Sequence, residues 1–153
     1  MDEQEYAGFW IRVGATLIDS LILCLIIMPI LFKIYGPDYL LEAGLVVGTW
    51  DFLLSWVFPA VAVVVFWLYK SATPGKLALR LTIVDADTGQ KPTLGQFIIR
   101  YIGYFVAMIP FFLGLVWVGI DDRKQGWHDK LARTVVLHNT QKVPVRFEQD
   151  QAR

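Results

Sequence analysis

Charged residues are scarce in this sequence. Lysine, arginine, aspartate and glutamate make up 18% of the 153 residues, whereas hydrophobic residues make up 56%. Soluble domains average about 25% charged residues, so this composition favours a membrane protein, and the length allows one domain at most. The formal net charge is zero, so the chain lacks the broad basic field of a nucleic-acid-binding protein, and we expect no nucleic-acid partner.

Cysteine and histidine are also rare. The single cysteine, Cys24, lies in an apolar run, which excludes a disulfide within the chain and a thiolate metal cluster. The two histidines show no metal-ligand spacing, so we expect neither a metal nor a cofactor. A cleavable signal peptide needs a basic start, but this chain begins MDEQEY. We therefore expect the first apolar run to remain in the protein as a membrane anchor.

Long hydrophobic runs are what the sequence has in abundance. They cover residues 9–32, 52–69 and 97–120, and each is close to the ~20 residues that a membrane-spanning helix needs. The first two predict clear transmembrane helices. The third contains Pro110 near its middle, and proline removes a backbone donor and kinks or breaks helices.

The basic residues predict the orientation. The loop at 33–51 carries one basic and three acidic residues, whereas the loop at 70–96 carries Lys70, Lys76, Arg80 and Lys91. By the positive-inside rule the second loop and the N-terminus are cytoplasmic, in a cell (inner) membrane. The segment after residue 121 is also basic. Either the third segment breaks near Pro110 and returns to the same side, which we favour, or it spans once.

Two short runs have strand character. Residues 77–85 alternate between apolar and polar side chains, and residues 133–139 are rich in β-branched residues. We expect a short β-hairpin on the cytoplasmic side, formed by pairing of these runs. The preceding stretch 71–77, SATPGKL, lacks the spacing of a phosphate-binding loop and is interpreted as a turn leaving the membrane. The predicted fold class is an all-α membrane protein: a small helical bundle of two transmembrane helices and a third, proline-broken segment.

Three polar residues share one face of the first hydrophobic segment. Seven residues separate Arg12 from Asp19, which places them on nearly the same helix face about 10 Å apart, with Thr16 between them. A carboxylate within a membrane helix costs ~2.5–3.5 kcal/mol and is by default a functional candidate. Arg100 is the best candidate partner for Asp19. The alternatives are a structural ion pair between helices, a proton- or cation-binding role for Asp19, and a lipid-headgroup role for the arginines.

The densest polar stretch is 120–136, IDDRKQGWHDKLARTVV. It contains Asp121, Asp122, His128 and Asp129, but no complete nucleophilic or metal-binding constellation, so we do not expect an enzyme. Capping a helix or tying down the following chain is the simpler interpretation of His128 and Asp129. Asp121 or Asp122 is a further candidate to meet an arginine of the first helix.

The order of these motifs resembles the RDD family of small membrane proteins. Arg12 and Asp19 in YAGFWIRVGATLIDSLIL match the family's first arginine and aspartate, ATPGKLALRLTIVDADTG resembles its loop, and DDRKQGWHDKLARTVV its closing motif. The resemblance covers about residues 6–137. It implies that the second family aspartate is Asp129, with Asp121 and Asp122 as alternatives. It also implies an integral membrane protein, with cation/proton exchange as one activity attributed to the family.

Two functions therefore compete. In the first, the protein is a small transporter or cation/proton exchanger that uses Asp19, with Arg12, Thr16 and Arg100 as further binding candidates. Two or three spans cannot enclose a path, so this function predicts a homo-oligomer or a larger membrane complex. In the second, the protein is a non-catalytic scaffold or accessory subunit whose charges hold the bundle together. Under both functions we expect residues 1–140 to form the membrane domain and residues 141–153 to form a polar C-terminal tail.

Overall fold

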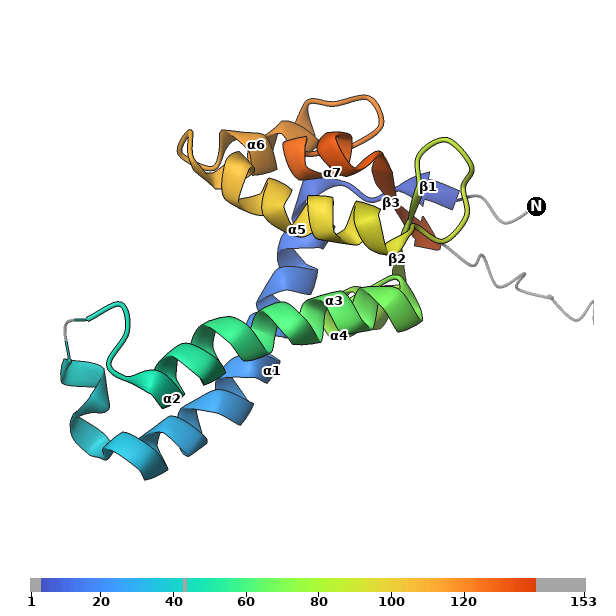
Figure 1. Cartoon of the computed structure of the whole chain (residues 1–153). Helices are drawn as coiled ribbons and strands as arrows, with labels where there is room; N and C mark the ends of the chain where they lie inside the picture. Colours follow the sequence, from blue (N-terminus) through green and yellow to red (C-terminus); the bar gives the residue numbers. More distant parts are fainter. Residues whose placement is uncertain (1–3, 43, 140–153) are drawn as a thin grey trace, which may run out of the picture.

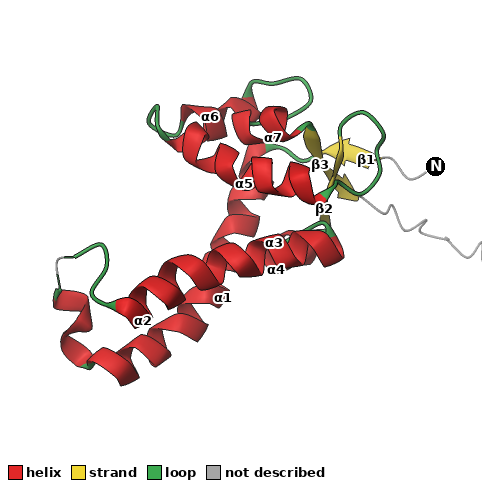
Figure 2. Ribbon diagram, viewed as in Figure 1, coloured by secondary structure: helices red, strands yellow, loops and turns green. Residues whose placement is uncertain are grey.

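The computed structural model describes residues 4–42 and 44–139. Helices dominate, and a small sheet lies at one end of the molecule (Figures 1 and 2). In chain order the elements are β1 (Gln4–Tyr6), α1 (Phe9–Tyr35), η1 (Pro37–Leu41), α2 (Thr49–Phe52), η2 (Leu53–Val57), α3 (Phe58–Lys70), α4 (Pro74–Ala78), β2 (Leu81–Asp85), α5 (Leu94–Met108), α6 (Leu113–Val116), η3 (Trp117–Gly119), α7 (Trp127–Ala132) and β3 (Thr134–Asn139). The predicted tail at 141–153 lies outside the described residues.

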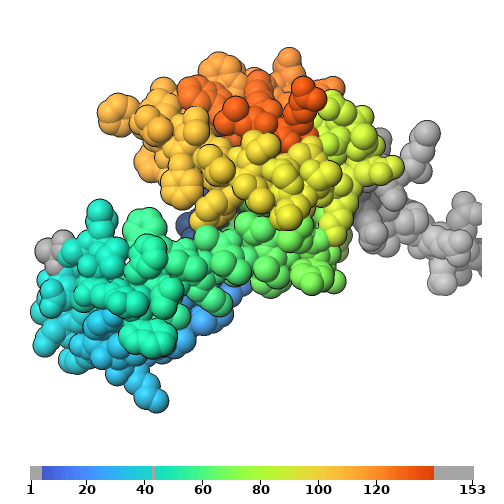
Figure 3. All heavy atoms as spheres, viewed as in Figure 1, coloured from blue at the N-terminus to red at the C-terminus, as the bar shows by residue number. Residues whose placement is uncertain are grey.

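Two long apolar helices confirm the first two predicted spans. One is α1, and the other is the continuous run α2–η2–α3 over Thr49–Lys70, in which η2 is a π-helical turn. Only 17% and 6% of their most apolar windows are buried within the protein. Side chains such as Leu21 and Leu25, 60% and 66% exposed, need another apolar surface to cover them. The pair extends away from the body formed by the later elements (Figure 3), and a bilayer supplies that cover.

The third hydrophobic segment is broken, as the sequence predicts. Helix α5 ends at Met108, and the helical run Leu113–Gly119 leaves at an angle of 116° to it. Pro110 lies in the break, and proline removes a backbone donor and kinks or breaks a helix. Phe111 and Phe112 have φ angles of 50° and 62°, in the left-handed region, which reverses the chain. The chain then passes back along α5 through α7 (Figure 1).

The predicted strands pair, but they do not form a hairpin. The sheet has three strands in the order β1-β3-β2, all antiparallel, with Ile83 opposite Val136 and Glu5 opposite His138. Helices α5, α6 and α7 separate β2 from β3 in the chain. Strand β2 begins at Leu81 rather than at residue 77, because Pro74 starts the short helix α4. The sheet brings the segments before α1, after α4 and after α7 to one end of the molecule.

The buried core lies where the sheet meets the ends of α3 and α5. Its members share near-complete burial: Ala7, Ala15, Trp67, Leu81, Ile83, Phe97 and Val136. The rings of Trp67 and Phe97 pack at 5.7 Å between centroids. The capping box of Thr93 and Gln96 fixes the start of α5 beside this core. The core therefore holds α1, α3, α5 and the sheet in register around the charged residues described next.

Candidate functional site

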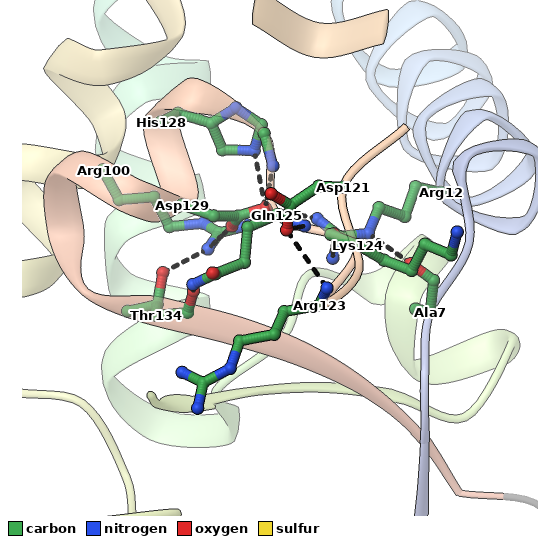
Figure 4. A network of polar contacts seen from close by, with 11 residues as sticks. Ala7, Arg12, Arg100, Asp121, Arg123, Lys124, Gln125, His128, Asp129 and Thr134 are labelled. Carbon is green, nitrogen blue, oxygen red and sulfur yellow. Dashed lines mark hydrogen bonds and ion pairs between the residues drawn. The ribbon is translucent and has the colours of Figure 1, made fainter. Parts of the chain in front are cut away.

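Asp129 is the centre of a buried ion cluster. Its carboxylate pairs with Arg12 Nη1 at 2.5 Å through Oδ2, and with Arg100 Nη1 through Oδ1 (Figure 4). Asp129 and Arg100 are fully buried, and Arg12 is 9% exposed. The three side chains come from α7, α5 and α1. One carboxylate thus joins three elements that are distant in sequence.

Arg12 is held by more than its ion pair. Its Nε donates to the carbonyl of Ala7 at 2.9 Å, and its Nη2 donates to the carbonyl of Lys124 at 2.6 Å. Arg12 lies in the first turn of α1, where the positive end of the helix dipole disfavours a cation. Asp129 and the two carbonyls offset that penalty. The arginine therefore fastens the loop before α7 to the start of α1.

Local structure positions Asp129. It lies in the first turn of α7, where an acidic residue is favoured, and its Oδ2 accepts from the backbone N–H of Gly126 at 3.0 Å. Helix α7 packs closely on α5 at Gly103, where a Cβ atom would lie 2.9 Å from the Cα of His128. Arg100 also donates through Nη1 to Thr134 Oγ1 at 2.6 Å, which ties α5 to the start of β3.

The electrostatics of the cluster follow from burial and from the two guanidiniums. Burial alone would raise the pKa of Asp129, but Arg100 and Arg12 outweigh it and hold that pKa well below its usual range. Burial lowers the pKa of His128 to about 3, so this imidazole is neutral near pH 7. It stacks on Tyr104 with 4.1 Å between ring centroids. The cluster is thus a permanent arginine–carboxylate–arginine triad lined by a neutral histidine.

Asp19 does not meet Arg100, and the expectation that the two pair is wrong. Its Oδ2 accepts from Thr73 Oγ1 at 2.5 Å, and its Oδ1 accepts from the backbone N–H of Gly75 at 2.7 Å. Thr73 is the N-cap residue of α4 and makes no side-chain cap bond of its own. Asp19 therefore supplies from another helix the acceptor that caps α4.

Glycine at position 75 makes this contact feasible. A Cβ atom there would fall on the carbonyl oxygen of Ala15 and lie 2.9 Å from Cγ of Asp19. Asp19 is only half-buried, and it borders a cavity of about 180 Å³ lined by apolar residues such as Ile22 and Phe58. Asp19 thus fastens α4 to the middle of α1 at the edge of an apolar space.

Comparison with known sequences decides the family. The sequence profile of the RDD family matches residues 6–133.

The chain belongs to the RDD family.

The relatives of this RDD protein carry no assigned activity. Two proteins of Bacillus subtilis, the uncharacterized YxaI and YckC, are 30% and 31% identical over 88% and 92% of this chain, and over 99% and 89% of their own lengths. An uncharacterized protein of Rickettsia prowazekii is 42% identical over 48% of this chain and 40% of its own length. A further relative from Bacillus subtilis, YteJ, is described as an uncharacterized membrane protein. No solved structure matches. The RDD protein is a membrane protein with several apolar helices, and its relatives do not say which molecule it acts on.

The RDD protein brings together some of its predicted site residues and separates others. Arg12, Arg100 and Asp129 meet, whereas Asp19 lies apart from them. Thr16 donates to the carbonyl of Arg12 at 3.0 Å, but it is exposed rather than turned into the protein interior. The face of α1 that Arg12, Thr16 and Asp19 share is covered only in part, and Thr16 lies on its uncovered part.

Asp121 and Asp122 do not meet an arginine of α1. Asp121 pairs with Lys130 and accepts from the backbone N–H of Gln125 at 3.1 Å, so it shapes the loop before α7. Asp122 is exposed. Of the three candidate aspartates, Asp129 is the one whose contacts reach both arginines, among the residues that the structure describes. Its assignment as the second aspartate of the family motif stays a prediction.

Sequence reasoning missed Thr73, Gly75 and Lys76. Thr73 before Pro74 is a typical start signal for a helix, and it was available in the sequence. Nothing in the sequence indicated that the cap acceptor would come from Asp19, 54 residues away. Lys76 is buried, 7% exposed, with Nζ 5.6 Å from the centroid of the Trp67 ring. A lysine just after a hydrophobic run usually lies in water, so nothing in the sequence marked it.

Proposed function

We propose that this RDD protein is a non-catalytic membrane scaffold or accessory subunit. The observation that carries the proposal is the contact of one buried carboxylate, Asp129, with Arg12 and Arg100. This buried triad joins α1, α5 and α7, and removing one member of such a cluster is strongly destabilising. It is poorly suited to binding and releasing a proton, because both arginines favour the charged form of the acid.

The contacts of Asp19 support the same function. Both of its oxygens accept hydrogen bonds, from Thr73 and Gly75, in a geometry that caps α4. Thus each of the motif's two candidate aspartates, Asp19 and Asp129, has a structural partner among the described residues. The exposed apolar faces of α1 and α3 leave room for a second copy or for a larger membrane partner.

The test compares ion movement with assembly in the same purified protein. Vesicles containing the wild-type chain are loaded with a pH-sensitive dye and challenged with sodium and potassium gradients. We expect no cation-driven proton movement, and we expect a stable complex of defined mass when the protein is extracted from its own membranes in mild detergent. Gradient-driven proton movement that Asp19→Asn abolishes would contradict the proposal.

A cation/proton exchanger is the second candidate, favoured by one observation. Asp19 is half-buried at the edge of the apolar cavity of about 180 Å³, as an ion-binding carboxylate would be. This function needs Asp19 to exchange Thr73 and Gly75 for an ion or a proton, and it needs further copies to enclose a path. The vesicle assay decides it: equal exchange by the wild type and by Asp19→Asn excludes Asp19 as the carrier.

The proposed location is the cell membrane, with the sheet on the cytoplasmic side. Strands β1, β2 and β3 share one end of the molecule, and the β2 loop carries basic residues such as Lys91. Single cysteines at Lys91 and at Asp38, in a Cys24→Ser background, test it. An impermeant maleimide should label Asp38→Cys in intact cells and leave Lys91→Cys unlabelled until the cells are opened. The reverse pattern would invert the orientation.

A further inference from the structure

A second, larger cavity lies beside the ion triad. Its volume is about 410 Å³, and residues of α1, α4, α5, α6 and α7 line it. Four of them carry nitrogen donors: Arg12, Lys76, Arg100 and His128. This volume falls within the range of small-molecule sites, which usually combine apolar walls with a few polar groups.

The buried end of the cavity carries excess positive charge. Arg12, Lys76 and Arg100 face it, and the carboxylate that approaches them is that of Asp129. Within residues 4–42 and 44–139, no carboxylate lies within 4.0 Å of Lys76 Nζ. Two guanidiniums and the amine of Lys76, whose pKa burial lowers, therefore share one buried carboxylate, since His128 is neutral.

Donors at this end also lack acceptors. Nε and Nη2 of Arg100 have no hydrogen-bond partner in the described part of the chain, although the side chain is fully buried. Its guanidinium lies 5.5 Å from the Trp67 ring and 5.9 Å from the Tyr104 ring, which offsets part of the cost of burial. Buried donors without acceptors are rare, and an anionic oxygen would satisfy them.

The other end of the cavity is apolar and open. Leu17, Met108, Phe112 and Val116 line it and are between 39% and 65% exposed, whereas the charged lining residues are at most 9% exposed. Leu17 belongs to the candidate span α1, so this opening lies on a surface that faces lipid. The cavity thus runs from an apolar mouth to a cationic floor.

We propose that this cavity binds an amphiphile with an anionic headgroup, head first, from the bilayer. The headgroup contacts Lys76 and Arg100, and the first part of its hydrocarbon chain lies against Leu17, Met108 and Phe112. A headgroup with phosphate or carboxylate oxygens satisfies the free donors, and the chain explains the apolar mouth. This site is independent of whether the protein acts as a scaffold or as an exchanger.

The experiment measures lipid retention by the full chain in a neutral detergent. The protein is incubated with equimolar lysophosphatidic acid and lysophosphatidylcholine that carry the same acyl chain, and native mass spectrometry counts each adduct. We expect the anionic lipid to be retained about ten-fold more than the zwitterionic one, because its phosphate makes charge-assisted bonds to the floor. Equal retention of the two lipids overturns the proposal.

Variants locate the site. Lys76→Gln should remove the preference, and Lys70→Gln, an exposed lysine outside the cavity, should keep it. Leu17→Trp should lower retention by blocking the mouth, whereas Leu25→Trp, equally exposed on the same helix but outside the cavity, should not. Retention of the preference in both Lys76→Gln and Leu17→Trp would show that the lipid binds elsewhere.

A free phosphate ion could satisfy the same donors as the headgroup of a lipid. A further measurement distinguishes these two ligands. Inorganic phosphate is added to the purified protein, and the melting temperature is followed in the wild type and in Lys76→Gln. We expect lysophosphatidic acid to raise the melting temperature of the wild type much more than inorganic phosphate does. An equal rise with both, lost in Lys76→Gln, would identify a phosphate site and overturn the role of the hydrocarbon chain.

Discussion

Replacing Asp129 by asparagine is the sharpest perturbation of the triad. The side chain keeps its shape, but it loses the charge that two buried arginines share. Asparagine also presents an amide N–H₂ group where one carboxylate oxygen accepted. Arg100, fully buried, would then face that group with its remaining donors already unpartnered.

The expected cost is large. Removing one partner of a buried ion pair leaves an uncompensated charge and costs about 3–5 kcal/mol. For a soluble domain of similar size, one kcal/mol lowers the melting temperature by about 2–4 °C, so the expected decrease is of order 10 °C. The exposed Asp122 provides the matched control, because Asp122→Asn removes the same charge from the loop before α7 without touching the triad.

The assay is thermal unfolding of the purified protein in detergent, followed by size-exclusion chromatography of the heated samples. Asp129→Asn should melt well below the wild type, and Asp122→Asn should melt at the same temperature as the wild type. The double variant Arg100→Met/Asp129→Leu should melt above Asp129→Asn. It replaces the buried Arg100–Asp129 pair by apolar side chains, so that only one arginine, Arg12, is left without its carboxylate. If Asp129→Asn melts no lower than Asp122→Asn, the triad does not hold the bundle together.

Three further perturbations test the remaining contacts. Asp19→Asn should lower the free energy of unfolding by about 1–3 kcal/mol. In the wild type, Asp19 accepts from Thr73 and Gly75, and in the variant one of these donors would face an amide N–H₂ group. The neighbouring exposed residue provides the control, Ser20→Ala, in the same melting assay. Gly103→Ala should lower the melting temperature, since its Cβ would lie 2.9 Å from the Cα of His128, whereas Gly95→Ala on the same helix has no atom nearer than 3.9 Å and should be neutral or stabilising. Asp85 has a pKa of about 2, lowered chiefly by the hydrogen bond from Gln96. Its folded-state pKa lies below its ordinary value, so its contribution is complete above about pH 4 and is lost as the pH falls towards 2. Melting curves of Asp85→Asn should lose that acid dependence, and those of Asp87→Asn should retain it.

The helices could be predicted from the sequence because hydrophobic length and a proline suffice to define them. Residues 9–32 and 52–69 lie within the observed Phe9–Tyr35 and Thr49–Lys70, and the break falls at Pro110. The pairing of the strands was harder to predict than the helices. The pattern of 133–139 predicts a strand, but nothing local shows that β1 would join it from the other side. The hairpin expectation failed because pairing partners are set by where the helices between them return.

The sequence pointed to Arg12, Asp19, Arg100 and Asp129, but not to their pairings, nor to Thr73, Gly75 and Lys76. A charge in an apolar segment marks Asp19 and Arg100, and family resemblance marks Asp129. The pairing of these charges depends on which face each helix turns towards its neighbours. Long-range packing sets that orientation. Arg100 faces α7 because Gly103 lets α7 lie against α5, and Asp19 meets α4 because Gly75 permits contact with α1. Two glycines thus decide the pairings, and neither has a sequence pattern that announces this.

The central position of β3 sets the order in which the protein can assemble during synthesis. β1 and β2 leave the ribosome early, yet each has its partner only in β3, which is made after all seven α-helices of the described chain. Arg12 likewise enters the first span long before Asp129 exists. Arg12 lacks its counter-ion until Asp129 has been synthesised, and β1 and β2 remain unpaired until β3 has followed. A chain that ends before Asp129 would leave β1, β2 and Arg12 without their partners at one end of the molecule.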